Sequence, residues 1–227
     1  MKKKIKTQCA ECSLPTFERI CITPGGKASK GCPTIGKKTL VEKAKKEYQA
    51  NPNAEFARQA SIQEGECYSE REKRPYLLHP IKPRFLEIIE FAQKMEYNHL
   101  GLLFCIGLAK EAAIVSQLFT NHGFKVTSVV CKAGGVPKEE IGIKEEEKIF
   151  IGGHESICNP ILQAMVVNDA KTDFNVLLGL CVGHDSLFFK YSDVPTTVLA
   201  VKDRVTGHNP LAALYTANSY YSWLNKS

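Results

Sequence analysis

Nine cysteines are the residues of this sequence with the clearest capacity for chemistry, and four of them lie near the start of the chain. Cys9 and Cys12 are separated by two residues, and Cys21 and Cys32 follow, with Pro33 directly after the last. A two-residue gap lets both sulfurs meet one ion or cluster, while the later cysteines complete the coordination from a loop. Four thiolates suit tetrahedral zinc or an iron–sulfur cluster, so this spacing predicts a metal site.

A second group of cysteines follows predicted β-strands. Cys105, Cys131 and Cys181 each close an apolar or β-branched segment that we expect to be a strand. The carboxyl ends of parallel strands line one edge of a sheet, which is where ligands bind. Cys158 precedes an Asn-Pro pair that predicts a helix start, whose partial positive charge favours thiolate. We therefore predict that these four cysteines hold a cofactor, although burial as ordinary core cysteines is the competing interpretation.

Polar residues gather at the same predicted edge. They are Lys132, Glu155, His184, Asp185, Asp203, Arg204 and His208. Of these candidate catalytic residues, His184 or Asp203 could act as acid or base, and Arg204 or Lys132 could hold an anionic group of a substrate. Three cysteines plus a water or substrate would leave the open position that a catalytic metal requires.

The elements that must position these residues are read from periodicity and from proline and glycine positions. Expected helices cover residues 38–50, 53–69, 110–122 and 210–224, with further helices opened by Pro83 and Pro160, and expected strands cover 100–106, 124–131, 174–181 and 196–202. This alternation predicts an α/β fold, with a small, mostly parallel, Rossmann-like sheet that carries helices on both faces. We predict three segments: a cysteine-rich metal-binding module at 1–36, a helical segment at 37–97, and the α/β domain at 98–227.

Composition limits the setting of this chemistry. The chain has 227 residues and a formal charge of +6, and no apolar run is long enough to cross a bilayer. The basic start at residues 1–6 is not followed by an apolar stretch, so we expect a cytoplasmic protein without an export signal, in a compartment where disulfides rarely persist. The lysines are scattered apart from those at the start and in residues 37–46, and thiolate–metal sites are anionic. A nucleic-acid partner is therefore not expected, and RNA binding by residues 37–46 is the alternative.

Several longer strings support a family resemblance. They are GL-x-KEA from Gly107, VVCK from Val129, E-x2-CNP from Glu155, GLCVGHD from Gly179 and KDRV-x-GHNP from Lys202. Over nearly its whole length the chain resembles a family of small, uncharacterised metal-binding proteins of anaerobic bacteria and archaea. That resemblance implies metal binding and an anaerobic setting but no particular reaction. The anaerobic setting favours an iron–sulfur cluster, of the 4Fe-4S type, over zinc.

These observations favour a cysteine-ligated metalloenzyme that acts on a small substrate at the sheet edge. An electron-transfer or metal-handling protein with a redox partner protein is the first alternative. A thiol redox sensor without metal in its core is the second. Cys67 belongs to neither cysteine group, and we interpret it as a structural thiol.

Overall fold

The computed structural model describes residues 6–226 and divides the chain into two compact units, residues 1–65 and 66–227. The predicted helical segment at 37–97 is thereby shared between the two units. Residues 1–5, which contain most of the predicted basic start, lie outside the described residues. Within the described range, no helix combines the length and the apolar character needed to traverse a bilayer.

The first unit joins a cysteine-rich segment to two helices. Its elements are the 3-10 turns η1 (Cys9–Glu11) and η2 (Thr16–Glu18), and the helices α1 (Pro33–Gly36), α2 (Lys38–Gln49) and α3 (Asn53–Glu66). Both longer helices were predicted, and α3 ends three residues earlier than expected. In the cysteine-rich segment the Arg19 side chain donates to the carbonyl oxygens of Leu14 and Cys12, at 2.8 and 3.1 Å. Polar hydrogen bonds of this kind organise a segment whose helices bury no residue.

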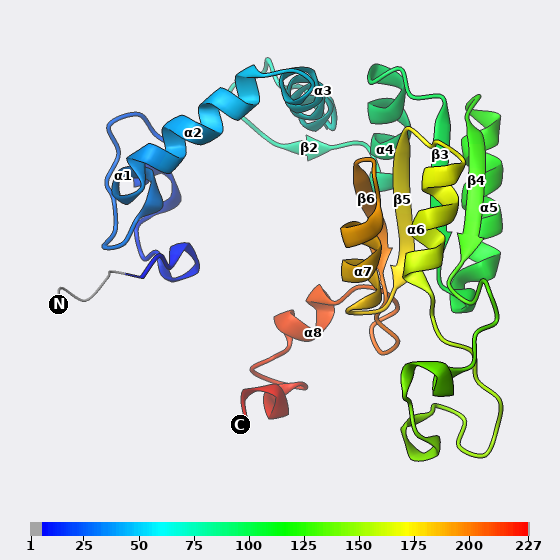
Figure 1. The fold of residues 1–227 in the computed structure, drawn as a ribbon. Helices are drawn as coiled ribbons and strands as arrows, with labels where there is room; N and C mark the ends of the chain where they lie inside the picture. Colours follow the sequence, from blue (N-terminus) through cyan, green and yellow to red (C-terminus); the bar gives the residue numbers. More distant parts are fainter. Residues whose placement is uncertain (1–5, 227) are drawn as a thin grey trace. The chain divides into compact units, whose positions relative to one another are not determined.

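The second unit is built on a parallel sheet, as predicted. Its strands are β3 (His99–Phe104), β4 (Lys125–Val130), β5 (Phe174–Leu180) and β6 (Thr196–Val201), in the order β4-β3-β5-β6. Figure 1 shows the four strands side by side. Every residue of β5 is buried, which explains its continuous apolar sequence. A short antiparallel pair, β1 (Tyr68–Ser69) with β2 (His79–Pro80), precedes the sheet.

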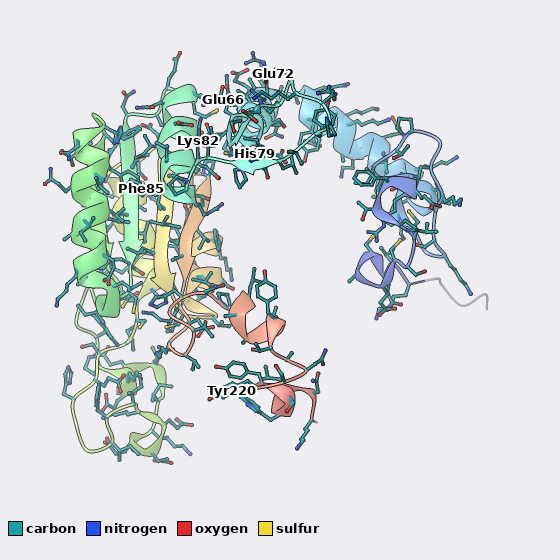
Figure 2. All side chains as sticks on the ribbon, turned by 180° about the vertical axis from the view of Figure 1, so that it is seen from behind. Glu66, Glu72, His79, Lys82, Phe85 and Tyr220 are labelled. Carbon is teal, nitrogen blue, oxygen red and sulfur yellow. The ribbon has the colours of Figure 1, made fainter. Side chains whose placement is uncertain are left out.

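Helices cover both faces of this sheet. They are α4 (Arg84–Lys94), α5 (Ala109–Asn121), α6 (Pro160–Asp169) and α7 (His184–Tyr191). From β3 the chain moves to β4 at one side of the sheet, and it then returns across β3 to β5 and β6. Because these connections are right-handed, the first places α5 on one face of the sheet, and the later two place α6 and α7 on the other face. Figures 1 and 2 show these two layers, with α4 beside α5. Phe85 of α4 stacks on Phe119 of α5, with 5.2 Å between the ring centroids.

The predicted terminal helix at 210–224 was wrong in its length. The structure has α8 (Leu211–Tyr215) and a separate 3-10 turn η6 (Ser222–Asn225). The Thr216 hydroxyl donates back to the Ala212 carbonyl oxygen at 2.9 Å, and the Ser219 hydroxyl donates to the Thr216 carbonyl oxygen at 3.2 Å. Such local side-chain hydrogen bonds compete with helical ones, so this serine- and asparagine-containing stretch does not continue the helix.

The carboxyl end of β5 is irregular at Gly179. Its φ is +68°, and the pairing of β5 with β6 shifts register between Leu178 and Leu180. A Cβ at this position would lie 2.2 Å from Cδ1 of Leu108, which is buried. Glycine is therefore required both by the left-handed backbone and by the close approach of Leu108.

We predict that Gly179→Ala lowers the free energy of unfolding by about 3 kcal/mol, because it adds overpacking to backbone strain. Gly123→Ala is the matched control, since Gly123 has a φ of +89° but no atom within 4 Å of its added Cβ. That control should lose only about 1 kcal/mol through strain. Urea unfolding followed by circular dichroism measures both, and equal losses in the two variants would contradict the packing argument.

Candidate functional site

Strand pairing brings two cysteines to the same point of the sheet edge. Phe104 and Val130 are the last paired residues of β3 and β4, and Cys105 and Cys131 follow them directly. The Cys131 amide donates to the Phe104 carbonyl oxygen at 2.8 Å, so the ladder continues through the cysteine. Both cysteines are buried, with 8% of Cys105 and 2% of Cys131 exposed. Their sulfurs therefore lie at the carboxyl edge but beneath its surface.

The start of α6 adds a third cysteine. Asn159 accepts a hydrogen bond at Oδ1 from the Leu162 amide at 3.0 Å, and Pro160 is the first helical residue, as predicted. The Asn159 amide donates to the Cys131 carbonyl oxygen at 2.7 Å, which ties the helix start to the end of β4. Cys158, immediately before this cap, is half-buried beside Cys131.

The three sulfurs form one hydrogen-bonded row with Cys131 in the middle. The Cys131 side chain hydrogen bonds to both Cys105 and Cys158, and the Ile106 amide donates to the Cys131 sulfur at 3.4 Å. Of the four cysteines predicted to converge, Cys105, Cys131 and Cys158 lie together, whereas Cys181 contacts Arg204 instead. We call these three residues the edge thiols.

The edge thiols differ in charge because they share protons. The hydrogen bond with Cys105 raises the pKa of Cys131, and the hydrogen bond with Cys158 and burial raise it further. The same contacts lower the pKa of Cys158 to about 4, first through Cys131 and then through His184. The pKa of Cys105 falls to about 5, again mainly through the hydrogen bond with Cys131. The middle sulfur thus keeps its proton while the two outer sulfurs favour the thiolate.

His184 is the predicted acid–base candidate that reaches the edge thiols. It is the first residue of α7, placed there by the turn at Gly183, whose φ is +87°. Contact with Cys158 raises the pKa of the imidazole, against an opposing effect of burial. Its Nδ1 is buried and has no hydrogen-bond partner within residues 6–226. A buried ring nitrogen without a partner beside a thiolate is suited to accepting, donating or coordinating.

Lysine and arginine side chains surround the row of sulfurs. Lys202, directly after β6, lowers the pKa of Cys105, and a Cβ on Gly107 would lie 3.5 Å from Lys202 Nζ and 3.9 Å from Cys105 Sγ. Arg204 donates from Nη2 to Cys181 Sγ at 3.2 Å, so Arg204 is the partner of Cys181. Lys132 Nζ donates to the Ser156 carbonyl oxygen and lies close enough to Cys158 to lower the pKa of that thiol.

Lys202 was not among the predicted site residues. The signal that could have identified it is its place directly after a parallel strand, which is equivalent to that of Cys105 and Cys131. The Lys202 amide donates to the Leu180 carbonyl oxygen at 3.1 Å, so the β5–β6 ladder carries it to the same edge.

Three of the predicted polar residues shape the turns around the edge. Asp185 Oδ1 accepts from the Gly183 and Ser186 amides, at 3.0 and 2.7 Å. Asp203 Oδ1 accepts from the Val205 and Thr206 amides, both at 2.9 Å. His208, at a φ of +68°, accepts at Nδ1 from the Asp203 amide at 3.1 Å. Their hydrogen bonds thus explain these residues as supports of the loops that carry His184 and Arg204.

Glu155 lies apart from the edge thiols. It is buried and pairs with Lys138, with 2.7 Å between Nζ and Oε1, and it accepts from the Ile149 amide at 2.9 Å. Residues 132–158 form a long excursion that Figure 1 shows beyond the carboxyl edge of the sheet. Glu155 holds this excursion together, so its contacts give it a structural rather than a catalytic place.

The four N-terminal cysteines line one cavity of the first unit. This cavity has a volume of about 120 Å³, and Cys9, Cys12, Cys21 and Cys32 all contribute to its wall. Cys9 and Cys21 are exposed, whereas Cys12 and Cys32 are half-buried. A hydrogen bond with Ser29 and a second with the Leu14 backbone lower the pKa of the Cys12 thiol. The predicted spacing therefore corresponds to a shared cavity.

Neither group of cysteines closes around a single point. Within residues 6–226, no group of three or more His, Cys, Asp or Glu side chains is arranged to hold one metal ion. A tetrahedral zinc site needs all its sulfurs about 2.3 Å from one centre. The N-terminal cysteines instead surround a cavity, and the edge thiols form a row in which each sulfur contacts its neighbour. Both groups offer soft sulfur donors.

Fold and site together define a cysteine-rich α/β protein with thiols at the carboxyl edge of a parallel sheet. The chain belongs to the family described as protein of unknown function DUF1847, whose model matches residues 32–199. An uncharacterised protein of the archaeon Methanocaldococcus jannaschii is 39% identical over 214 residues, which cover 94% of this chain and 95% of that protein. No solved structure matches the chain.

We predict that His184→Gln raises the pKa of the Cys158 thiol in metal-free, reduced protein, because it removes the imidazole that favours the thiolate. The pKa of Cys158 is lowered from 9.0 to about 4. The Cys158 thiolate therefore contributes fully to the free energy of unfolding above pH 9, and this contribution is lost as the pH falls towards 4. The variant should lose less stability over that range. The rate of Cys158 alkylation by iodoacetamide against pH, read by mass spectrometry, measures the pKa.

His122→Gln is the control for this experiment, because His122 is exposed at the end of α5. It should leave the alkylation profile of Cys158 unchanged. An identical profile in wild type and His184→Gln would show that the imidazole has no influence on the thiol.

Proposed function

We propose that this protein is a cysteine-ligated metalloprotein whose sheet edge acts on a small substrate. The observation that supports this proposal most strongly is the row formed by Cys105, Cys131 and Cys158, which come from three separate segments of the chain. Three thiols brought into mutual contact at the ligand-binding edge of a parallel sheet make a soft donor set. The competing interpretation, that these are ordinary core cysteines, does not explain why Cys158 contacts His184 and Cys105 contacts Lys202.

The strand order supports the proposed place of the substrate. In β4-β3-β5-β6 the chain reverses direction at β3, and in Rossmann-like sheets ligands bind where the order reverses. Cys105 follows β3, and Cys181 follows β5, its neighbour across this point. We assign the substrate to this crevice and regard the sheet as Rossmann-like.

We assign an iron–sulfur cluster, of the 4Fe-4S type, to the N-terminal cavity. Four cysteines around a space of about 120 Å³ fit a body larger than one ion, and zinc is the alternative. At the sheet edge, the three thiols would hold a metal centre and leave a position open. When bound, these groups supply electron transfer at the first site and Lewis-acid or redox chemistry at the second.

The chain's own residues have separate tasks in this proposal. His184 holds a proton beside Cys158, where it can be passed to a substrate or back to the thiolate. Burial of Cys105 and Cys131 excludes water from the Cys105 end and the middle of the row. Asp185 and Asp203 fix the turns that present His184 and Arg204. Such chemistry suits a reducing, cytoplasmic setting, which we propose for this protein.

A non-catalytic electron-transfer or metal-handling role is the second candidate. Two apolar residues beside the edge, Val182 and Val205, are 93% and 76% exposed. Each is a neighbour in sequence of the Cys181–Arg204 pair, and exposed apolar groups around a redox site favour contact with a partner protein. In that case reduction of the bound metal would not depend on any small substrate.

We predict that protein purified without oxygen contains two separable metal sites. Cys12→Ser should remove iron and acid-labile sulfide from the first site and leave the metal of the edge in place. Cys131→Ser should have the converse effect, because the two groups lie in separate compact units. Elemental analysis, sulfide assay and the visible absorbance spectrum measure these contents.

Cys67→Ser is the control, because Cys67 belongs to neither group and should leave both contents unchanged. Simultaneous loss of all metal in each single variant would contradict two independent sites. Wild-type protein that holds neither iron nor zinc after this purification would overturn the proposal.

A further inference from the structure

The lysine and arginine side chains around the edge thiols differ from other lysines of the second unit because they have no carboxylate partner. Elsewhere in the second unit, well-covered lysines pair with glutamates: Lys82 with Glu90 at 2.6 Å, and Lys148 with Glu145 at 2.7 Å. Lys132, Lys202 and Arg204 form no ion pair with a carboxylate in the described part of the chain. Lys132 and Lys202 are half-buried, and the anions that they face are the thiolates of Cys158 and Cys105. Once those thiolates hold a metal, as proposed above, the two ammonium groups have no carboxylate partner, and covered cations are normally paired.

The carboxylates of the same edge are already engaged. Asp185 and Asp203 each accept two backbone N–H groups of their own turns. The first cause of the lowered pKa of Asp203 is its hydrogen bond with the Thr206 backbone, so its charge is stabilised by the loop itself. In the described part of the chain neither carboxylate contacts Lys202 or Arg204, so the donors of these two cations are not used by them.

Donor capacity remains on both cations. A guanidinium has five N–H donors and an ammonium has three. Arg204 uses one of its donors on the Cys181 sulfur, and Lys202 contacts Cys105. Arg204 is exposed and Lys202 is half-buried, so a ligand entering from solvent can reach both.

The backbone leaves room between Lys202 and the nearest thiol. Gly107 is exposed, and a Cβ there would make ordinary contacts of 3.5 Å with Lys202 Nζ and 3.9 Å with Cys105 Sγ. Glycine thus keeps the approach to the ammonium and the sulfur open. A planar or tetrahedral group of oxygens beside Gly107 would meet Lys202 and lie next to Cys105.

We infer that the sheet edge binds a small oxyanion with at least two negative charges, a phosphate or a dicarboxylate, through Lys202 and Arg204. This inference rests on the proposed function for the location of the reaction at the sheet edge, and it adds the chemical class of the substrate. The ligand's oxygens replace the missing carboxylate partners, and its reacting part lies beside the edge thiols. Lys132, on the opposite side of the row, is held by the Ser156 carbonyl oxygen and serves the Cys158 end.

Calorimetric titration of the full-length, anaerobically purified protein with inorganic phosphate and, separately, with succinate tests this inference. Saturable binding of either probe that weakens with salt is expected. Lys202→Met and Arg204→Met should each weaken it about tenfold or more, because each removes a charge-assisted hydrogen bond. Methionine retains the apolar stem of Lys202, which passes within 3.8 Å of the position of a Gly179 Cβ.

Two further variants sharpen the result. Lys190→Met, on the exposed side of α7, should bind as wild type does. Gly107→Ala changes no charge but fills the approach to Lys202, so it should also weaken binding. Preference for phosphate or for succinate separates the two classes of oxyanion.

Absence of saturable binding of both probes would overturn the inference, as would equal affinity in wild type, Lys202→Met and Arg204→Met. Unchanged binding in Gly107→Ala would place the ligand elsewhere and would also overturn it. Metal content is measured in the same samples. Anion binding by protein without metal would leave the inference standing and remove the proposed function, whereas metal without anion binding would do the reverse.

Discussion

Parallel pairing of β3 with both β4 and β5 is the constraint on which the whole edge depends. Because the strands run in the same direction and in register, the residues that follow them emerge side by side. Cys105 and Cys131 are neighbours for this reason alone. The Asn159 amide, bonded to the Cys131 carbonyl oxygen, extends the same ladder to the start of α6 and brings Cys158 into line. A change of one residue in the β3–β4 register would turn one sulfur to the opposite face.

Proton sharing gives this row its chemical character. The buried middle thiol has one proton to share between its two neighbours, and because it keeps that proton the outer sulfurs favour the thiolate. His184 and Lys202 stabilise the two ends separately. The site therefore has a neutral centre and charged ends, and a metal ion that displaces the shared proton would meet two sulfurs already prepared to coordinate.

The fold was largely predictable because its signals are local and strong. Continuous apolar runs identified β3 and β5, and Pro160 with Asn159 identified the start of α6. The predicted terminal helix was wrong because Thr216 and Ser219 hydrogen bond to nearby carbonyl oxygens, a competition that periodicity does not reveal. Convergence of Cys105 and Cys131 was also predictable, since residues that follow parallel strands share an edge. The same argument placed Cys181 with them, but Cys181 contacts Arg204 instead.

The remainder of the site could not be read from spacing. Glu155 precedes Cys158 by three residues, yet it turns away to Lys138, and only the path of residues 132–158 determines that. Asp203 and His208 were equally plausible as catalytic groups until their hydrogen bonds to the backbone were known. Lys202 follows the fourth predicted strand, together with Asp203 and Arg204, but nothing in the sequence marked it as the neighbour of Cys105. Its side chain runs past Gly179 and Gly107 to reach Cys105.

The central claim is that thiolates at the sheet edge ligate a metal. X-ray absorption spectroscopy at the absorption edge of the metal, on anaerobically purified Cys9→Ser/Cys12→Ser protein, tests this claim most directly. With the N-terminal site disabled, the remaining metal should show about three sulfur neighbours near 2.3 Å, as expected for ligation by Cys105, Cys131 and Cys158. A spectrum with only nitrogen and oxygen neighbours, or a protein without metal, would contradict a thiolate centre at the sheet edge.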